Sequence, residues 1–270
     1  MESEPMSLNL DECLAFARNA ALQAGHCILK YRKLVLDRVY TSRTHFTTAA
    51  DEEIDQRLIV AVRERFPDHS VYSEESGWAR KQDTSRYTWV CDAVDGTINL
   101  ASGFTDHVAF CLALCEGGRP ILGVVNAVLR GEFYESIDGQ GAYCNGQRIE
   151  VSQEANIAKV LMGIDSGKYR RAAHLPYLER LYSESGITVC LNTGCASVPL
   201  VLVASGVLHA YLATSLAPED MAAAVAIIRG AGGKVTNLQG EKWTIKDPSI
   251  FAANPILHEK LSRFLNIPVL

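Results

Sequence analysis

Two carboxylates three residues apart, Asp92 and Asp95, follow a strand-like apolar run in segment 89–99. Paired carboxylates at a strand end repel each other, but they suit a hard divalent cation, which prefers oxygen ligands. Gly96 and Thr97 follow and open a helix-like stretch, whose first backbone N–H groups can bind an anion. A cation site beside an anion site is what metal-dependent phosphate chemistry requires. The segment therefore predicts phosphoryl transfer.

Three further acids occupy positions of the same kind. Glu75 follows another short apolar run, whereas Asp51 and Asp220 each lie at the start of a helix pattern. Each acid alone has an ordinary interpretation, as a solvated turn or as a helix cap that the helix dipole favours. Because α/β sheets gather their chemistry at strand ends, we expect these acids to converge with the first pair on one site.

The elements that must position these residues form a mixed α/β pattern. Apolar periodicity predicts helices over 11–31, 51–66, 172–183, 195–206, 218–230 and 256–264. Strands are predicted at 70–73, 87–91, 107–115, 121–129, 132–137, 160–164, 188–191, 208–212, 234–236 and 250–253. Glycine turns at 117–118, 130–131 and 145–146 favour antiparallel hairpins, and Trp78 and Arg80 are expected in an exposed turn.

This mixture of hairpins with strand–helix alternation predicts a layered α/β (α+β) architecture rather than a simple doubly wound sheet. No linker-like stretch divides the chain. We therefore expect one catalytic domain over residues 1–270, with α/β halves at roughly 1–150 and 151–270.

The bulk properties narrow the function classes. The chain has 270 residues, a net charge of −5 and 48% hydrophobic residues, which argues against a basic face for nucleic acid or a membrane surface. No apolar run reaches the roughly 18–20 residues of a membrane span, and the first residues do not resemble a signal peptide. None of the eight cysteines forms a CxxC pair, so we expect reduced thiols and a cytoplasmic protein.

These motifs together resemble the inositol monophosphatase family of Mg²⁺-dependent, lithium-sensitive phosphatases. The resemblance extends over nearly the whole chain and rests on Glu75, the Asp92-x-x-Asp95-Gly96-Thr97 block, Asp220 before an apolar helix, Thr48-Ala49-Ala50-Asp51, Gly141-Ala142-Tyr143-Cys144-Asn145-Gly146 and Gly194-Cys195-Ala196. It implies an α-β-α-β-α sandwich, a homodimer, and hydrolysis of a small phosphorylated alcohol such as an inositol, cyclitol or sugar phosphate.

The resemblance also implies roles for particular residues. The metal ligands would be Glu75, Asp92, the backbone carbonyl of Val94, Asp95 and Asp220. Catalysis would involve Asp51, Thr97 and Glu75, with the N–H groups of Gly96 and Thr97 holding the phosphate. Substrate contacts would come from Asp95, Gly194, Cys195, Ala196, Ala213 and Asp220. The cofactor would be Mg²⁺, two or three ions per site, with Mn²⁺ as a substitute.

The chain departs from the family pattern at several positions. Ala213 stands where inositol-specific members carry a glutamate that contacts substrate hydroxyls, and His45 stands where an acid would favour a third metal. Ala93, Leu100 and Ala217 also differ from the usual residues. The substrate alternatives therefore stay open and include histidinol phosphate, a sugar bisphosphate and a 3′-phosphonucleotide. A different class of function is a non-catalytic regulatory binding module, which has no need of mutually repelling carboxylates.

Overall fold

The computed structural model describes residues 8–32, 39–40, 46–81, 85–167, 170–184, 187–190 and 192–269. Its helices are α1 (Leu10–Arg32), α2 (Ala49–Arg65), α3 (Thr97–Ser102), α4 (Leu175–Glu184), α5 (Ser197–Ala204), α6 (Pro218–Gly230) and α7 (Pro255–Leu265). Short 3₁₀ turns occur at Val128–Arg130, Ile157–Lys159 and Arg171–His174.

An eight-stranded sheet carries the first half of the fold. Its strands are β3 (Ser70–Ser73), β4 (Gly77–Arg80), β5 (Tyr87–Asp95), β6 (Ala109–Glu116), β7 (Arg119–Ala127), β8 (Glu132–Ile137), β9 (Ala142–Cys144) and β10 (Gln147–Ile149). They lie in the order β10-β9-β8-β7-β6-β5-β3-β4, antiparallel except for β3 beside β5. The glycine turns do join consecutive strands as antiparallel hairpins, as predicted from the sequence.

One prediction about this sheet is wrong. Trp78 and Arg80 were expected in an exposed turn, but they belong to β4, which pairs antiparallel with β3. An edge strand of four residues with one partner buries little apolar surface, so its sequence lacks the alternation that marks a strand. Trp78 indeed remains about half exposed, at 48%.

A five-stranded sheet carries the second half. Its strands are β11 (Leu161–Asp165), β12 (Thr188–Cys190), β13 (Ala210–Ala213), β14 (Lys234–Thr236) and β15 (Ile250–Ala253), in the order β12-β11-β13-β15-β14. The strands β12, β11 and β13 run parallel, whereas β15 pairs antiparallel with both β13 and β14. A separate two-stranded ribbon joins β1 (Val39–Tyr40) to β2 (Phe46–Thr47).

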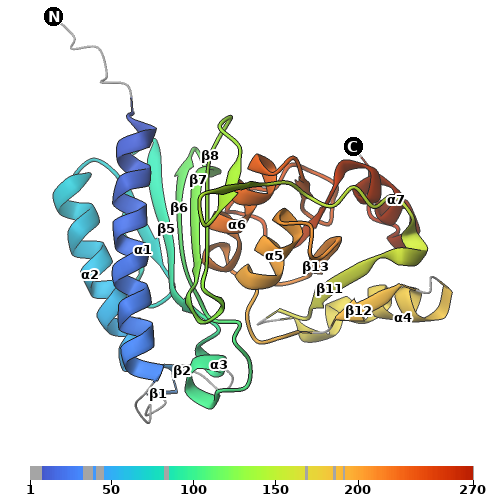
Figure 1. Ribbon diagram of the computed structural model, residues 1–270, viewed down its shortest axis with the longest axis horizontal. Helices are drawn as coiled ribbons and strands as arrows, with labels where there is room; N and C mark the ends of the chain where they lie inside the picture. Colours follow the sequence, from blue (N-terminus) through green and yellow to red (C-terminus); the bar gives the residue numbers. More distant parts are fainter. Residues whose placement is uncertain are drawn as a thin grey trace, which may run out of the picture.

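Helices and sheets alternate in layers (Figure 1). The helices α1 and α2 cover the outer face of the large sheet, α5 and α6 lie between the two sheets, and α4 and α7 cover the far face of the small sheet. Each interface has its own apolar core, represented by Leu112, Val201 and Met162. The layered α/β class predicted from the sequence is therefore confirmed.

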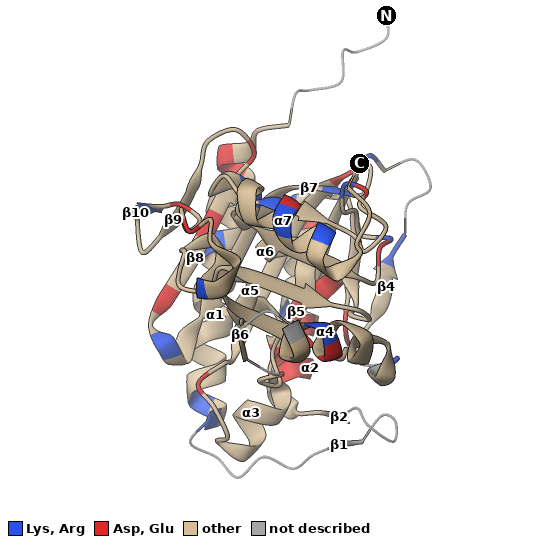
Figure 2. Cartoon of the chain, turned by 90° about the vertical axis from the view of Figure 1, so that its right-hand side faces the viewer, with Lys and Arg blue, Asp and Glu red and all other residues tan. Residues whose placement is uncertain are grey.

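The central layer explains how residues from both halves meet. Every residue of α5 is buried, as is α6 from Glu219 to Ile228, because both helices lie between two sheets. Basic and acidic residues are interspersed on outer elements such as α7 (Figure 2). Within the described ranges, no helix combines the length and apolar character that crossing a bilayer requires.

Candidate active site

A β-bulge at the end of β5 places Asp92 and Asp95 on one face of the large sheet. In a regular strand, residues three apart point to opposite faces. Here Asp92 pairs with Cys111 and Asp95 with Ala109, so β5 has one more residue than β6 between the two pairs. The N–H of Val94 donates a 2.9 Å hydrogen bond to Asp92 Oδ1 within the bulge.

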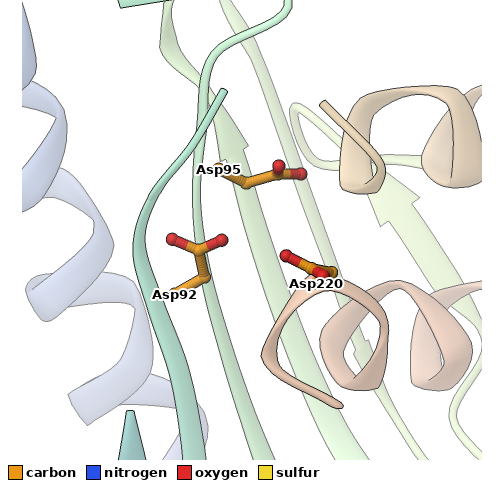
Figure 3. Close-up of side chains that lie close together, drawn as sticks. All are labelled: Asp92, Asp95 and Asp220. Carbon is orange, nitrogen blue, oxygen red and sulfur yellow. The ribbon is translucent and has the colours of Figure 1, made fainter. Parts of the chain in front are cut away.

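Asp220 joins this pair from the first turn of α6 (Figure 3). Carboxylate oxygens of Asp92, Asp95 and Asp220 lie within 4.8 Å of one another, and all three residues are buried. Asp220 is fixed by a 2.9 Å hydrogen bond from the N–H of Ala217, which also explains its place at the start of the helix. Three buried like charges are costly unless a cation joins them, and an all-carboxylate donor set fits Mg²⁺.

Asp95 also links the large sheet to α5. Its Oδ2 accepts hydrogen bonds from the N–H groups of Ala196 at 3.0 Å and Ser197 at 2.6 Å, so it caps this helix from the other half of the chain. The Cys195 thiol donates to the same oxygen at 3.1 Å. Burial raises the pKa of Cys195 well above its ordinary value, so the group stays a protonated donor. The structure thus brings two residues of the predicted substrate-contact segment against Asp95.

The Gly96–Thr97 turn opens α3 beside these acids. Gly96 has φ +93°, and a Cβ there would lie 2.3 Å from the backbone oxygen of His107. Gly194, at φ +75°, packs against α3 with no room for a side chain, since a Cβ would lie 2.9 Å from a methyl of Ile98. Gly96 therefore lets the backbone at His107 approach this turn, and Gly194 lets its own segment pack against side chains of α3.

Thr97 connects the turn to Asp51 at the start of α2. Its hydroxyl lies 3.1 Å from Asp51 Oδ1 and 2.9 Å from the carbonyl oxygen of Val94. Asp51 is held in turn by the N–H of Thr48 at 2.9 Å and by a short contact from the Thr48 hydroxyl. Burial raises the pKa of Asp51 to about 6, despite these hydrogen bonds.

Glu75 stands apart from the three-acid cluster. It lies half-buried in the turn after β3, where the N–H of Glu74 donates to the Cys91 carbonyl oxygen at 3.2 Å. Burial, followed by the charge of Asp51, raises the pKa of Glu75 to about 7. The predicted acids therefore form two groups, the cluster of Asp92, Asp95 and Asp220 and the pair of Asp51 and Glu75. Metal ligation by Glu75 and by the Val94 carbonyl remains a prediction.

Sequence reasoning missed one acid, Asp165. It is 5% exposed at the end of β11, paired in register with the fully buried Ala213 at the end of β13. The signal that drew attention to Asp92, an acid that closes an apolar strand, was equally present at Asp165. His45, which bears on a third metal, lies outside the described residues.

Comparison with known proteins decides the family. Residues 9–266 match the model of the inositol monophosphatase family. The chain belongs to the inositol monophosphatase family. It is 30% identical to human inositol monophosphatase 1 over 266 residues, which cover 95% of each protein.

Solved structures agree with this placement. An inositol monophosphatase from Anabaena (Nostoc) sp. PCC 7120 has a TM-score of 0.84 and 30% identity, covering 97% of this chain and 99% of that one. Inositol monophosphatase II from Staphylococcus aureus MSSA476 has a TM-score of 0.78 and 26% identity over 94% of each chain. That enzyme, SaIMPase-II, has been solved with inositol monophosphate and with 2′AMP bound. The chain is thus a phosphatase of the phosphoric monoester hydrolase class, in a generally metal-dependent family whose sandwich fold it shares.

Proposed function

We propose that the protein is a Mg²⁺-dependent phosphomonoesterase that hydrolyses a small phosphorylated alcohol with an activated water. The observation that carries this proposal is the convergence of Asp92, Asp95 and Asp220, whose oxygens lie within 4.8 Å of one another. Family membership supports the phosphatase reaction, and the oxygen-only donor set supports Mg²⁺, with Mn²⁺ as a substitute.

The proposed ligands are these three aspartates together with Glu75 and the Val94 carbonyl, for two or three ions. Bound Mg²⁺ supplies positive charge that lowers the pKa of a water and offsets the charge of the leaving alkoxide. Because the metal charge would activate the water and stabilise the leaving group, the protein needs no serine or cysteine nucleophile.

The chain's own residues position the reactants. The Thr97 hydroxyl, 3.1 Å from Asp51 Oδ1, would orient the attacking water together with Asp51, and Asp51 or Glu75 would accept its proton. The N–H groups of Gly96 and Thr97 would hold the phosphate oxygens at the start of α3. Gly194, Cys195, Ala196 and Ala213 would line the space for the alcohol.

The substrate class we favour is an inositol, cyclitol or sugar phosphate. SaIMPase-II, which binds inositol monophosphate, supports this choice, although it also binds 2′AMP. The alternatives are histidinol phosphate, a sugar bisphosphate and a 3′-phosphonucleotide. We further propose that the chain forms one catalytic domain, because the site contains residues from both halves. We also propose that it is a cytoplasmic homodimer, and light scattering can measure the mass of the assembly.

Phosphate release by three forms of the protein tests the function. The three forms are the wild type, Asp92→Asn and Asp138→Asn, assayed with 4-nitrophenyl phosphate and with inositol 1-phosphate. Asp92→Asn should remove nearly all turnover in saturating Mg²⁺, because it removes one carboxylate from the cluster. Asp138→Asn is the matched control, since Asp138 is an exposed ion-pair partner of Arg119. Normal turnover in Asp92→Asn would refute the proposal. A melting temperature that rises with Mg²⁺ while no phosphomonoester is hydrolysed would instead favour a binding module.

A further inference from the structure

The strands β11 and β13 are adjacent and parallel in the small sheet (Figure 1). Asp165 ends the first of them and Ala213 ends the second. Because they are paired in register, their side chains lie on the same face, which is also the face of the Gly163–Tyr211 pair. Tyr211 and Ala213 belong to the apolar core shared with α5 and α6, so this face looks toward the candidate active site. A carboxylate at position 165 is thus one strand away from position 213.

A cavity of about 170 Å³ lies against this face. Asp165, Tyr211 and Cys195 line it, together with His107, Thr193 and the apolar Leu202. Cys195 also donates its thiol hydrogen bond to Asp95, so this side chain contacts both the cavity and a member of the three-acid cluster. The cavity therefore adjoins the place where the proposed alcohol would lie.

Local contacts fix Asp165 but do not account for its charge. Asp165 Oδ1 accepts hydrogen bonds from the N–H of Gly167 at 2.7 Å and from Asn192 Nδ2 at 2.9 Å. Gly167 in turn packs so closely on Ser215 that a Cβ would lie 1.8 Å from the Ser215 carbonyl oxygen. An asparagine at 165 could make both hydrogen bonds. Burial raises the pKa of Asp165, the hydrogen bond from Gly167 lowers it, and the charge of Asp95 raises it further, with a net upward shift.

Tyr211 contributes a hydroxyl group to the same cavity. Its hydroxyl is close enough to Asp165 to favour the carboxylate, yet among the described residues it has no hydrogen bond of normal geometry. Tyr211 is only 2% exposed, so solvent does not satisfy this hydroxyl. A buried acceptor and a buried donor thus share one small cavity.

We propose that Asp165 and the Tyr211 hydroxyl together bind a hydroxyl group of the leaving alcohol. The carboxylate with which this chain selects polyol phosphates thus lies one strand away from position 213. A hydroxyl group can donate to Asp165 and accept from Tyr211 at once, whereas an ammonium group could only donate. The apolar side of the cavity, which includes Leu202, suits the C–H face of such a ring. This inference rests on the proposed phosphatase function and names its substrate class.

Two phosphate esters test the inference, myo-inositol 1-phosphate and cyclohexyl phosphate. Both have a six-membered carbon ring, but the second lacks the five free hydroxyl groups of the first. Asp165→Asn keeps the acceptor for Gly167 and Asn192 but removes the charge. It should raise KM for inositol 1-phosphate about tenfold, with kcat and the kinetics of cyclohexyl phosphate within about twofold of wild type. Tyr211→Phe should raise the same KM severalfold without lowering the melting temperature. The double variant should resemble Asp165→Asn, since both groups act on one hydroxyl.

Equal losses on the two esters would show that Asp165 only supports the fold, and unchanged kinetics on both would show that it touches no substrate; either result overturns the inference. If Asp165→Asn does not fold, Tyr211→Phe decides by the same comparison. If the wild type hydrolyses neither these esters nor 4-nitrophenyl phosphate, the proposed function fails, and calorimetric binding of free myo-inositol then tests Asp165 separately. Binding weakened about tenfold in Asp165→Asn would support the inference, and equal or absent binding would overturn it.

Discussion

The backbone N–H of Ser197 donates a 2.6 Å hydrogen bond to Asp95 Oδ2, across 102 positions of the chain. This contact joins the end of β5 in the large sheet to the first turn of α5 in the central layer. One carboxylate therefore both caps a buried helix and contributes to the acid cluster. Any substitution of Asp95 changes the packing between the layers as well as the candidate metal site.

We expect Asp95→Ala to be less stable than Asp95→Asn in the metal-free protein, because both substitutions remove the charge but only the asparagine keeps an acceptor oxygen. The alanine leaves the N–H groups of Ala196 and Ser197 without their acceptor at the start of α5, and loss of a helix cap costs about 1–2 kcal/mol. Urea unfolding in EDTA measures the change. An alanine variant as stable as the asparagine variant would contradict the capping role that we assign to Asp95.

Asp92→Asn should stabilise the metal-free protein. It keeps an oxygen for the Val94 N–H but removes one of three like charges within 4.8 Å, which should raise the free energy of unfolding by on the order of 2 kcal/mol. Saturating Mg²⁺ should reverse the order, because only the wild type retains all three acids to bind the ion. Thermal melts in EDTA and in Mg²⁺ measure both comparisons. A variant less stable than wild type in EDTA would show that repulsion within the cluster is unimportant.

Thr97→Val should reduce turnover about 100-fold or more, whereas Thr97→Ser should stay within about tenfold of wild type. The valine has nearly the same shape but lacks the hydroxyl that bridges Asp51 and the Val94 carbonyl. Steady-state phosphate release measures the effect, with circular dichroism as the check on folding. Equal activity of the valine and serine variants would exclude a role for the hydroxyl.

His258 should make the protein sensitive to acid far from the active site. Burial, then the charge of Lys234, lowers the pKa of His258 from 6.5 to about 4. The unfolded chain therefore binds a proton that the folded one does not between these values, so stability falls as pH drops from about 6.5 to 4. The shift corresponds to about 3 kcal/mol, fully lost below pH 4.

His258→Gln provides the comparison for that pH dependence, because the amide can still reach Thr236 Oγ1, which lies 3.0 Å from His258 Nε2. Urea unfolding at pH 7 and pH 4.5 should show a smaller loss of stability in this variant than in wild type. Equal losses in the two proteins would mean that His258 is already protonated in the folded state, or that it does not control acid unfolding.

The sequence was sufficient wherever local chemistry decides the structure. Asp51 and Asp220 begin helices as predicted, since each occupies the third position of its helix and accepts from the backbone three residues earlier. The apolar pattern also predicted α6, which spans Pro218–Gly230, because a helix buried between two sheets carries an unbroken apolar signal.

Long-range contacts could not be predicted in this way. The bulge that brings Asp92 and Asp95 to one face depends on the register of β5 against β6, which no local pattern encodes. The predicted helix over 195–206 begins later, at Ser197, because its first N–H groups bind Asp95. Asp165 gained significance only from its neighbour Ala213, which lies on a strand that comes much later in the chain.

The dependence of phosphate release on Mg²⁺ concentration tests the central claim most directly. Wild-type protein stripped with EDTA should hydrolyse inositol 1-phosphate at background rate, and added Mg²⁺ should restore turnover along a saturable curve. Asp92→Asn should require far more Mg²⁺, or show no recovery, because the cluster of Asp92, Asp95 and Asp220 has lost a ligand. Turnover that persists in EDTA, or a Mg²⁺ response that is identical in Asp92→Asn, would contradict the account.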